Sequence, residues 1–183
     1  MEAVIDREPG ASLAIRAATG DELAFARLVD AHHDDMARVA YVICGDADLA
    51  QEAAQAAWPL AWRKVGSVRD PSKIRAWLVS IAANEARQLV RRRSRRAVRE
   101  VAVDSEPAQT AATRGGDPGM RAAEMDLANA MARLGDTDRA IVALRYVAGL
   151  TSEEIGGAIG MTSGGVRART ARVLDRLRRD LEG

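Results

Sequence analysis

Two groups of arginines are the residues of this 183-residue chain whose type and spacing could do chemistry. The first group begins at Arg87 and continues through the run RRRSRR at 91–96; the second runs from Arg167 to Arg179 at intervals of one to four residues. Guanidinium groups bind phosphate oxygens through charge-assisted hydrogen bonds, and clustered like charges repel unless an anion neutralises them. Both groups therefore predict contact with a nucleic-acid backbone. For the first group alone, a solvated basic helix end remains open.

Composition excludes several other kinds of chemistry. The chain is 48% hydrophobic and 29% charged with a net charge of +1, which is typical of a soluble globular protein whose local charge matters more than its total. The single cysteine, Cys44, cannot form an internal disulfide, and the adjacent His32 and His33 lack zinc-ligand spacing. No nucleophile with its base and no phosphate loop is found. We expect no enzyme activity, no cofactor and no metal.

Neither a leader peptide nor a run of apolar residues long enough to cross a membrane is visible in the sequence. A cytoplasmic location without membrane insertion is therefore expected.

A helix from about residue 71 to 96 must position the first arginine group. Asp70 and Pro71 supply an N-cap oxygen and a residue already fixed at helical φ. A stripe at helical spacing follows, with one polar member: Ile74, Trp77, Leu78, Ile81, Ala82, Glu85 and Leu89. The pattern predicts a packed rod with a cationic C-terminal end.

Two earlier helices can complete a bundle with this rod. One is expected from Asp21 to Gly45, and the next begins at the capping residue Asp46. Pro59 lies inside that second pattern, which predicts a kink or an early end. Residues 1–19 lack strong periodicity and are expected to form a loose lead-in.

The stretch from Glu100 to Gly119 has no apolar period and is rich in Pro, Gly, Thr and Asp, which predicts a flexible linker. A further helix should follow Pro118. The apolar segment 141–147 could be strand or helix by pattern alone, and a capped start at Asp136 or Thr137 favours helix.

The second arginine group falls within a predicted helix-turn-helix. Thr151 and Glu154 match a capping box, Gly160 can end the short helix, and Thr162 or Ser163 can begin the next. The apolar side of the second helix would contain Val166, Thr170, Val173, Leu177 and Leu181. The arginines then form an exposed flank suited to DNA. A purely structural helical hairpin is the alternative, and the coincidence of signals favours DNA binding.

Three segments, in this order, resemble the extracytoplasmic function (ECF) group of the sigma-70 family of bacterial RNA polymerase sigma factors. They are GDADLAQEAAQAAWPLAW, RAWLVSIAANEARQLVRRRSRR and LRYVAGLTSEEIGGAIGMTSGGVRARTARVLDRLR. The resemblance implies an all-α fold of two small helical domains, the second containing the helix-turn-helix. It implies sigma region 2 at 22–96, a linker at 97–119 and sigma region 4 at 120–181.

The resemblance also implies a function: a sigma factor that binds core RNA polymerase, directs it to specific promoters and helps to open promoter DNA. An anti-sigma factor is a further partner that it suggests. By similarity, polymerase contacts fall on Glu52, Gln55 and Trp58, with the usual paired acids reduced to Glu52. DNA contacts in region 2 fall on Asn84, Arg87, Gln88, Arg91 and Arg92. Those in region 4 fall on Ser163, Gly165, Arg167, Arg169, Thr170, Arg172 and Arg176, where Gly165 replaces the usual threonine.

Two other classes of protein remain open. A stand-alone helix-turn-helix regulator would need only the C-terminal domain for DNA and would use the N-terminal helices as an interaction domain. An anti-sigma or other interaction protein would use the bundle for binding, but it would not need two arginine-rich surfaces.

Overall fold

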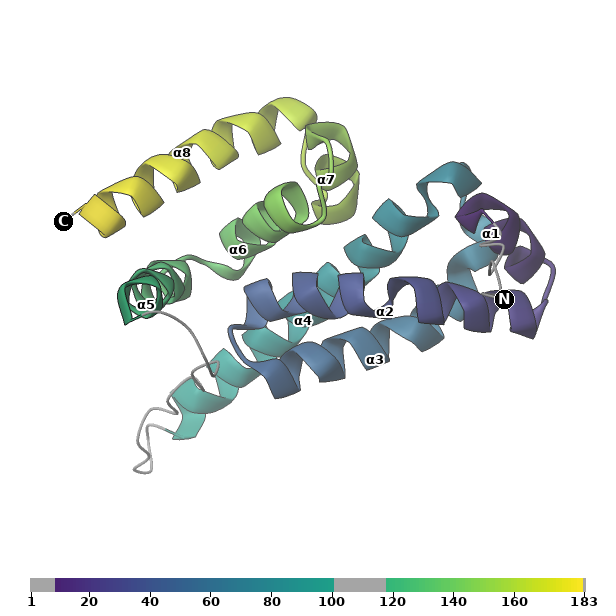
Figure 1. Cartoon of the computed structure of the whole chain (residues 1–183), viewed down its shortest axis with the longest axis horizontal. Helices are drawn as coiled ribbons and strands as arrows, with labels where there is room; N and C mark the ends of the chain where they lie inside the picture. The colour runs from purple at the N-terminus through teal and green to yellow at the C-terminus, as the bar shows by residue number, and fades with distance from the viewer. Residues whose placement is uncertain (1–8, 101–117, 183) are drawn as a thin grey trace, which may run out of the picture.

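The computed structural model describes the backbone of residues 9–100 and 118–182, with side chains for 9–97 and 123–182, and these residues form helices and turns without any strand (Figure 1). The fold class is therefore all-α, as predicted. The α-helices are α1 (Gly10–Ala18), α2 (Glu22–Cys44), α3 (Ala47–Lys64), α4 (Ile74–Glu100), α5 (Pro118–Ala132), α6 (Asp136–Val142), α7 (Ser152–Ile159) and α8 (Ser163–Glu182). Short 3₁₀ turns at Val65–Ser67 and Pro71–Lys73 join α3 to α4, and the π-helical turn Ala143–Val147 follows α6. None of the described helices is long and apolar enough to span a bilayer.

The helix ends in the first domain follow the predicted capping residues. The Asp21 side chain accepts a hydrogen bond from Ala24 N, and Asp46 accepts one from Leu49 N. Gly45 ends α2 with a φ of 67°, in the left-handed region that a glycine enters without strain. Local sequence signals therefore set where α2 ends and α3 begins.

The expected loose lead-in was wrong, and of the two outcomes expected at Pro59 the early end was wrong. Residues 10–18 of the supposed lead-in form α1, because Leu13, Ala14 and Ala17 are buried against the bundle; residues 1–8 lie outside the described part of the chain. Helix α3 does not end at Pro59 but continues to Lys64. Pro59 and Gln55 are both exposed, so the carbonyl group that loses its intrahelical donor can bond to water.

Most of the predicted linker, residues 101–117, lies outside the described residues. Of its ends, residues 97–100 continue α4 and residues 118–119 begin α5, so the described part of the 97–119 segment is helical. The segment 141–147, which could be strand or helix by its apolar pattern, is helical, as the predicted cap favoured. Its helix starts differently, because Gly135 is the N-cap and Asp136 lies in the first turn.

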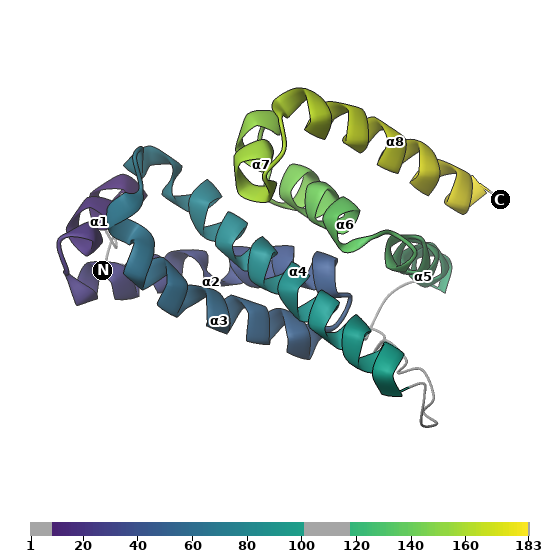
Figure 2. The same ribbon diagram turned by 180° about the vertical axis from the view of Figure 1, so that it is seen from behind.

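The core of the first domain lies between α2, α3 and α4, with Leu28, Ile43 and Leu78 fully buried. The same cluster of buried side chains continues into the second domain through Ile141 and Leu144. The two domains therefore share one packed core, which the sequence did not predict. In both Figure 1 and Figure 2, α6 and α7 lie between α8 and the bundle of α2 to α4.

The helix-turn-helix is present as predicted. Thr151 and Glu154 form the full capping box, and Gly160 ends α7 with a φ of 74°. Gly156 allows the turn to close, since a Cβ atom there would lie 2.5 Å from the carbonyl oxygen of Met161. On the inner side of α8, Val166, Val173 and Leu177 are buried. Leu181 is exposed, contrary to its predicted place on the apolar side of this helix.

Candidate nucleic-acid interface

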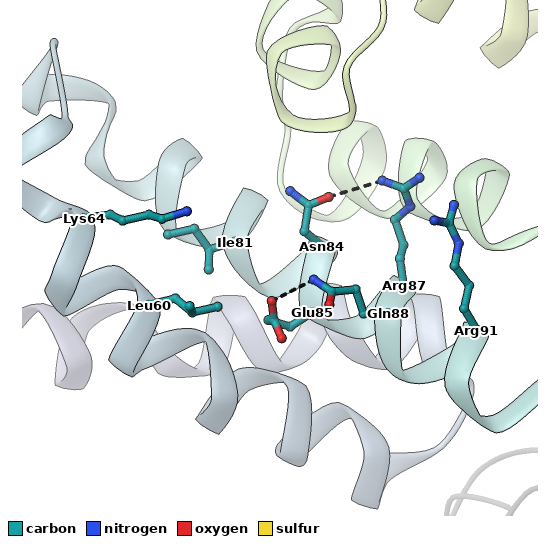
Figure 3. Close-up of a pocket in the computed structure, with 8 residues that line it drawn as sticks. All are labelled: Leu60, Lys64, Ile81, Asn84, Glu85, Arg87, Gln88 and Arg91. Carbon is teal, nitrogen blue, oxygen red and sulfur yellow. Dashed lines mark hydrogen bonds between the residues drawn. The ribbon is translucent and has the colours of Figure 1, made fainter. Parts of the chain in front are cut away.

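Helix α4 places Asn84, Arg87 and Arg91 on one side, one helical turn apart (Figure 3). Arg87 Nη1 donates to Asn84 Oδ1 at 3.2 Å, which holds the two side chains together. They line a pocket of about 390 Å³ whose other walls are Leu60, Lys64, Ile81, Glu85 and Gln88. Three cationic side chains, two amides, two apolar side chains and one carboxylate, Glu85, therefore surround one hollow, and its net positive charge suits a phosphate and the base beside it.

The second domain covers part of this surface. Asn84 Nδ2 donates to Ala158 O at 3.0 Å, and Arg87 Nη2 donates to Thr137 Oγ1 at 3.0 Å. Asp136 Oδ2 lies 3.3 Å from Arg87 Nε and 2.9 Å from Arg91 Nε. Three of the five residues proposed for DNA contact in the first domain are thus bonded to the second domain.

Other polar and cationic residues at this end of α4 bond within the first domain. Gln88 and Arg92 are exposed; Gln88 Nε2 donates to Glu85 Oε1 at 3.0 Å, and Arg92 Nη2 donates to Gln88 Oε1 at 3.4 Å. Arg93 reaches back to the N-cap Asp46 at 2.9 Å. This end of α4 therefore presents positive charge to solvent.

Helix α8 presents the second arginine group. Arg167 and Arg172 are exposed, and Arg176 donates to Arg133 O at 3.0 Å. Arg169 is half-buried, with its Nε 2.5 Å from Asp138 Oδ1 on α6. A DNA phosphate would have to compete with Asp138 for Arg169, whereas Arg167 and Arg172 are accessible without rearrangement.

The small residues of α8 have local roles. The Thr170 hydroxyl donates to Val166 O at 2.8 Å within the helix. The cap is Thr162, whose Oγ1 accepts from Gly165 N at 3.1 Å, while Ser163 is the first helical residue. Gly165 could not carry a larger side chain freely, because its Cβ would lie 3.2 Å from Thr162 Oγ1.

The three residues proposed to contact polymerase separate into two environments. Glu52 and Gln55 are exposed on α3. Trp58 is only 9% exposed, and its ring packs edge-on against Phe25 with centroids 5.7 Å apart. Trp58 Nε1 donates to His33 Nδ1 at 3.1 Å, and the Gln51 amide lies 3.0 Å from the other ring nitrogen of His33. Trp58 therefore offers a partner little surface, and it positions the exposed side of α3 through His33 and Gln51.

Two functional candidates were missed in the sequence. Lys64, one of two lysines in the chain, reaches the pocket because α3 continues past Pro59; its place beside Arg63 at a helix end was the available signal. The sequence pattern predicts Asp136 as a helix cap and gives no role to its acidic neighbour Asp138. No local pattern indicates that these carboxylates pair with arginines 31 to 49 residues away.

Cys44 is half-buried, and burial raises the pKa of its thiol to about 11. It is therefore protonated at neutral pH, and a protonated thiol is a poor nucleophile and a poor metal ligand. Among the described residues, no group of three or more His, Cys, Asp or Glu side chains could hold a metal ion.

Comparison with known families gives two matches within this chain. Residues 28–96 match Sigma-70 region 2, and residues 130–179 match Sigma-70 region 4. The chain is 30% identical to the RNA polymerase sigma factor NccH of Alcaligenes xylosoxydans xylosoxydans, over 91% of each chain. It is 28% identical to the ECF RNA polymerase sigma factor SigW of Bacillus subtilis, covering 88% of this chain and 91% of SigW. The probable RNA polymerase sigma factor RfaY of Xanthomonas campestris is 28% identical, but the match spans 42% of its length.

Two solved structures share the fold. CnrH in complex with the cytosolic domain of CnrY has a TM-score of 0.69 and 23% identity, covering 96% of this chain and 98% of CnrH. The sigma factor RpoE of Bartonella quintana, in complex with the anti-sigma factor NepR, also has a TM-score of 0.69 and 23% identity, covering 86% of this chain and 96% of RpoE. Both matches extend over the two helical domains together.

Proposed function

Because the chain belongs to the extracytoplasmic function group of the sigma-70 family of RNA polymerase sigma factors, we propose how its residues divide the work of promoter recognition and opening. Region 4 reads the upstream promoter element through α8. Region 2 holds the downstream element and the strand that becomes unpaired. Core RNA polymerase brings both regions to the same promoter. We place the boundaries of these regions at 22–96 and 120–181, joined by 97–119, and the protein in the cytoplasm with its template.

Helix α8 is the element that we assign to the upstream duplex. Arg167 and Arg172 are exposed near its N-terminal half, and a helix of this kind enters the major groove with its early residues toward the bases. We assign Arg167 and Arg169 to base or near-base contacts, and Arg172 and Arg176 to phosphates. Ser163, Gly165 and Thr170 lie at the start and side of the helix and allow the backbone to approach DNA closely.

The pocket on α4 is the place that we assign to an unpaired nucleotide. Lys64, Arg87 and Arg91 supply charge for its phosphate, while Asn84 and Gln88 supply amide donors and acceptors for a base edge. Leu60 and Ile81 give the base an apolar wall. Arg92 extends the cationic surface along the helix toward the flanking backbone. This arrangement favours an opened strand over an intact duplex, because a base within a duplex is not free to enter a hollow.

We assign the polymerase contact to Glu52 and Gln55, and we assign to the buried Trp58 the role of positioning their side of α3. Their exposed side of α3 is distinct from the pocket, so polymerase and DNA can be held at once. The two similar structures contain CnrY and the anti-sigma factor NepR, which supports an anti-sigma factor as a partner of this chain too.

The observation that carries this proposal is the pair of cationic surfaces on two different helical domains, one beside a pocket and one on a helix-turn-helix. Purified chain should be mixed with bacterial core RNA polymerase and a promoter library, and run-off transcripts sequenced. Promoter-specific transcripts are expected, and they should weaken when Arg167 and Arg169 are both changed to alanine.

Arg178→Ala is a matched control for that experiment, because Arg178 lies on the same helix but pairs with Asp175, 3.3 Å away on α8 itself. It should leave the transcripts unchanged. A chain that binds DNA but not core polymerase would contradict the proposal and would identify a stand-alone helix-turn-helix regulator.

A further inference from the structure

The first turn of α6 carries two carboxylates, and each is bonded to an arginine that we assign to DNA. Asp136 bonds Arg87 and Arg91 on α4, and Asp138 bonds Arg169 on α8. From this we infer that the α6 turn is an autoinhibitory clasp: Asp136 takes the place of a DNA phosphate on region 2 and keeps the free chain closed. The inference rests on the proposed function, since it concerns the regulation of the same DNA-binding surface.

The geometry at Asp136 resembles that of a bound phosphate. One carboxylate oxygen lies within 3.3 Å of two guanidinium groups, and Thr137 adds its hydroxyl to Arg87. The Arg87 side chain is 13% exposed and Asp136 is 22% exposed, so bulk water screens this contact less than it screens a surface ion pair. DNA cannot occupy the same donors until Asp136 has left them.

Other contacts around the clasp also join a donor group to an acceptor group across the two regions. Arg75 Nη1 donates to Ala148 O at 2.8 Å, Asn84 donates to Ala158 O, and Lys73 Nζ lies 3.9 Å from Glu154 Oε1. In each of these the donor belongs to region 2 and the acceptor to region 4. Region 4 thus meets region 2 as an anionic and carbonyl-rich surface, which a polyanion can replace.

The closed arrangement also buries a hydrogen-bond donor that destabilises it. Arg139, one turn along α6 from Asp136, is half-buried, and its Nε is buried without a hydrogen-bond partner in the part of the chain that the structure describes. A buried donor without an acceptor disfavours the state that buries it. Opening would return this group to water, so the clasp can hold the free chain and still release it when polymerase and DNA bind.

The clasp can be tested in the full chain by zero-length carbodiimide cross-linking. Lys73 is one of only two lysines, and its contact with Glu154 reports the closed state. In Asp136→Asn the Lys73–Glu154 cross-link, measured by mass spectrometry, should fall several-fold. The same variant should bind a fluorescein-labelled single-stranded oligonucleotide of mixed sequence roughly tenfold more tightly, as expected for loss of a charged hydrogen bond that competes with DNA. Rising NaCl should also lower the cross-link yield of the wild-type chain, since salt screens ion pairs.

Asp126→Asn is the matched control, because Asp126 is an exposed carboxylate on α5 of the same domain and its loss changes the net charge equally. It should alter neither readout. The inference is overturned if Asp136→Asn leaves either the cross-link or the DNA affinity unchanged, or if Asp126→Asn has the same effects. Failure of the proposed function would look different: the cross-link would respond as described, but wild-type chain would direct no transcription with core polymerase.

Discussion

The two surfaces that we assign to DNA differ in how accessible they are. On α8, Arg167 and Arg172 are exposed, and α8 lies on the outer side of the molecule (Figure 2). On α4, Asn84, Arg87 and Arg91 are bonded to α6 and α7. Two arginines of the surface that we assign to intact duplex are therefore accessible in the free chain, and the surface that we assign to opened DNA is partly covered. The difference suggests an order of events in which upstream recognition can precede engagement of the melted strand.

The largest effect should come from breaking the turn that presents α8. In Gly156→Ala the new Cβ would lie 2.5 Å from Met161 O, which is backbone and cannot move aside without opening the turn. We expect a loss of roughly 2–3 kcal/mol in the free energy of unfolding, as for other overpacked sites. Urea denaturation followed by circular dichroism would measure it.

Gly157→Ala provides the control for that change. Gly157 is the next residue on α7, and nothing lies within 4 Å of its added Cβ. The substitution should stabilise the chain by about 0.5–1 kcal/mol, because alanine favours helix over glycine. Equal destabilisation by both variants would show that the tight turn is not the reason for a glycine at 156.

The next largest effect should be on the exposed surface. Arg167→Ala should weaken binding of upstream promoter duplex roughly tenfold to a hundredfold, the usual cost of losing a base contact from arginine. Because Arg167 is exposed, the loss should be visible with the free chain as well as with the polymerase complex. Fluorescence anisotropy on a selected promoter fragment would measure both, and a loss confined to the complex would mean that α8 is not accessible beforehand.

Arg91→Ala should show the opposite pattern and a smaller effect. In the free chain Arg91 is bonded to Asp136, so its removal should cost little DNA affinity. In the polymerase complex we expect a roughly threefold to tenfold shorter lifetime of the open promoter, since a phosphate contact is worth about 1 kcal/mol. Heparin-challenge decay of the open complex would measure the lifetime. An equal loss of DNA affinity in the free chain would show that Arg91 is not masked.

The smallest effect should be on salt dependence. With about four phosphates neutralised by the opened protein, log affinity should fall with log salt at a slope of roughly −3 to −4. Asp136→Asn frees Arg87 and Arg91, so its slope on a single-stranded oligonucleotide should be steeper than that of the closed wild-type chain by roughly 0.7 for each additional phosphate contact. Titrations of both chains on the same oligonucleotide would compare the slopes, and identical slopes would argue that no further contact has been released.

Much of the fold could be predicted from local signals. The caps at Asp21 and Asp46, the left-handed glycines at 45 and 160, and the capping box at Thr151 lie where short-range hydrogen bonding required them. The α1 helix was missed because a short segment with small apolar residues has little period of its own and is stabilised by packing. The continuation of α3 past Pro59 was missed for a related reason, since solvent satisfies the carbonyl group that the proline leaves unpaired.

The positions of the cationic side chains were easier to predict than their environment. Arginine spacing was enough to identify both cationic helices, and the order of the motifs was enough to identify the family. The pairing of Asp136 with Arg87 and Arg91 could not be predicted, because it depends on how the two domains pack and no local pattern encodes that. The burial of Trp58 depends in the same way on Phe25 and His33, which lie on a different helix.

We infer that this chain opens promoter DNA only together with core polymerase, which must uncover the α4 surface. Permanganate reactivity of unpaired thymines on a selected promoter would test it most directly, with chain alone, core polymerase alone and both together. We expect reactive thymines only when both are present. Reactive thymines with the chain alone, or none with both, would contradict it.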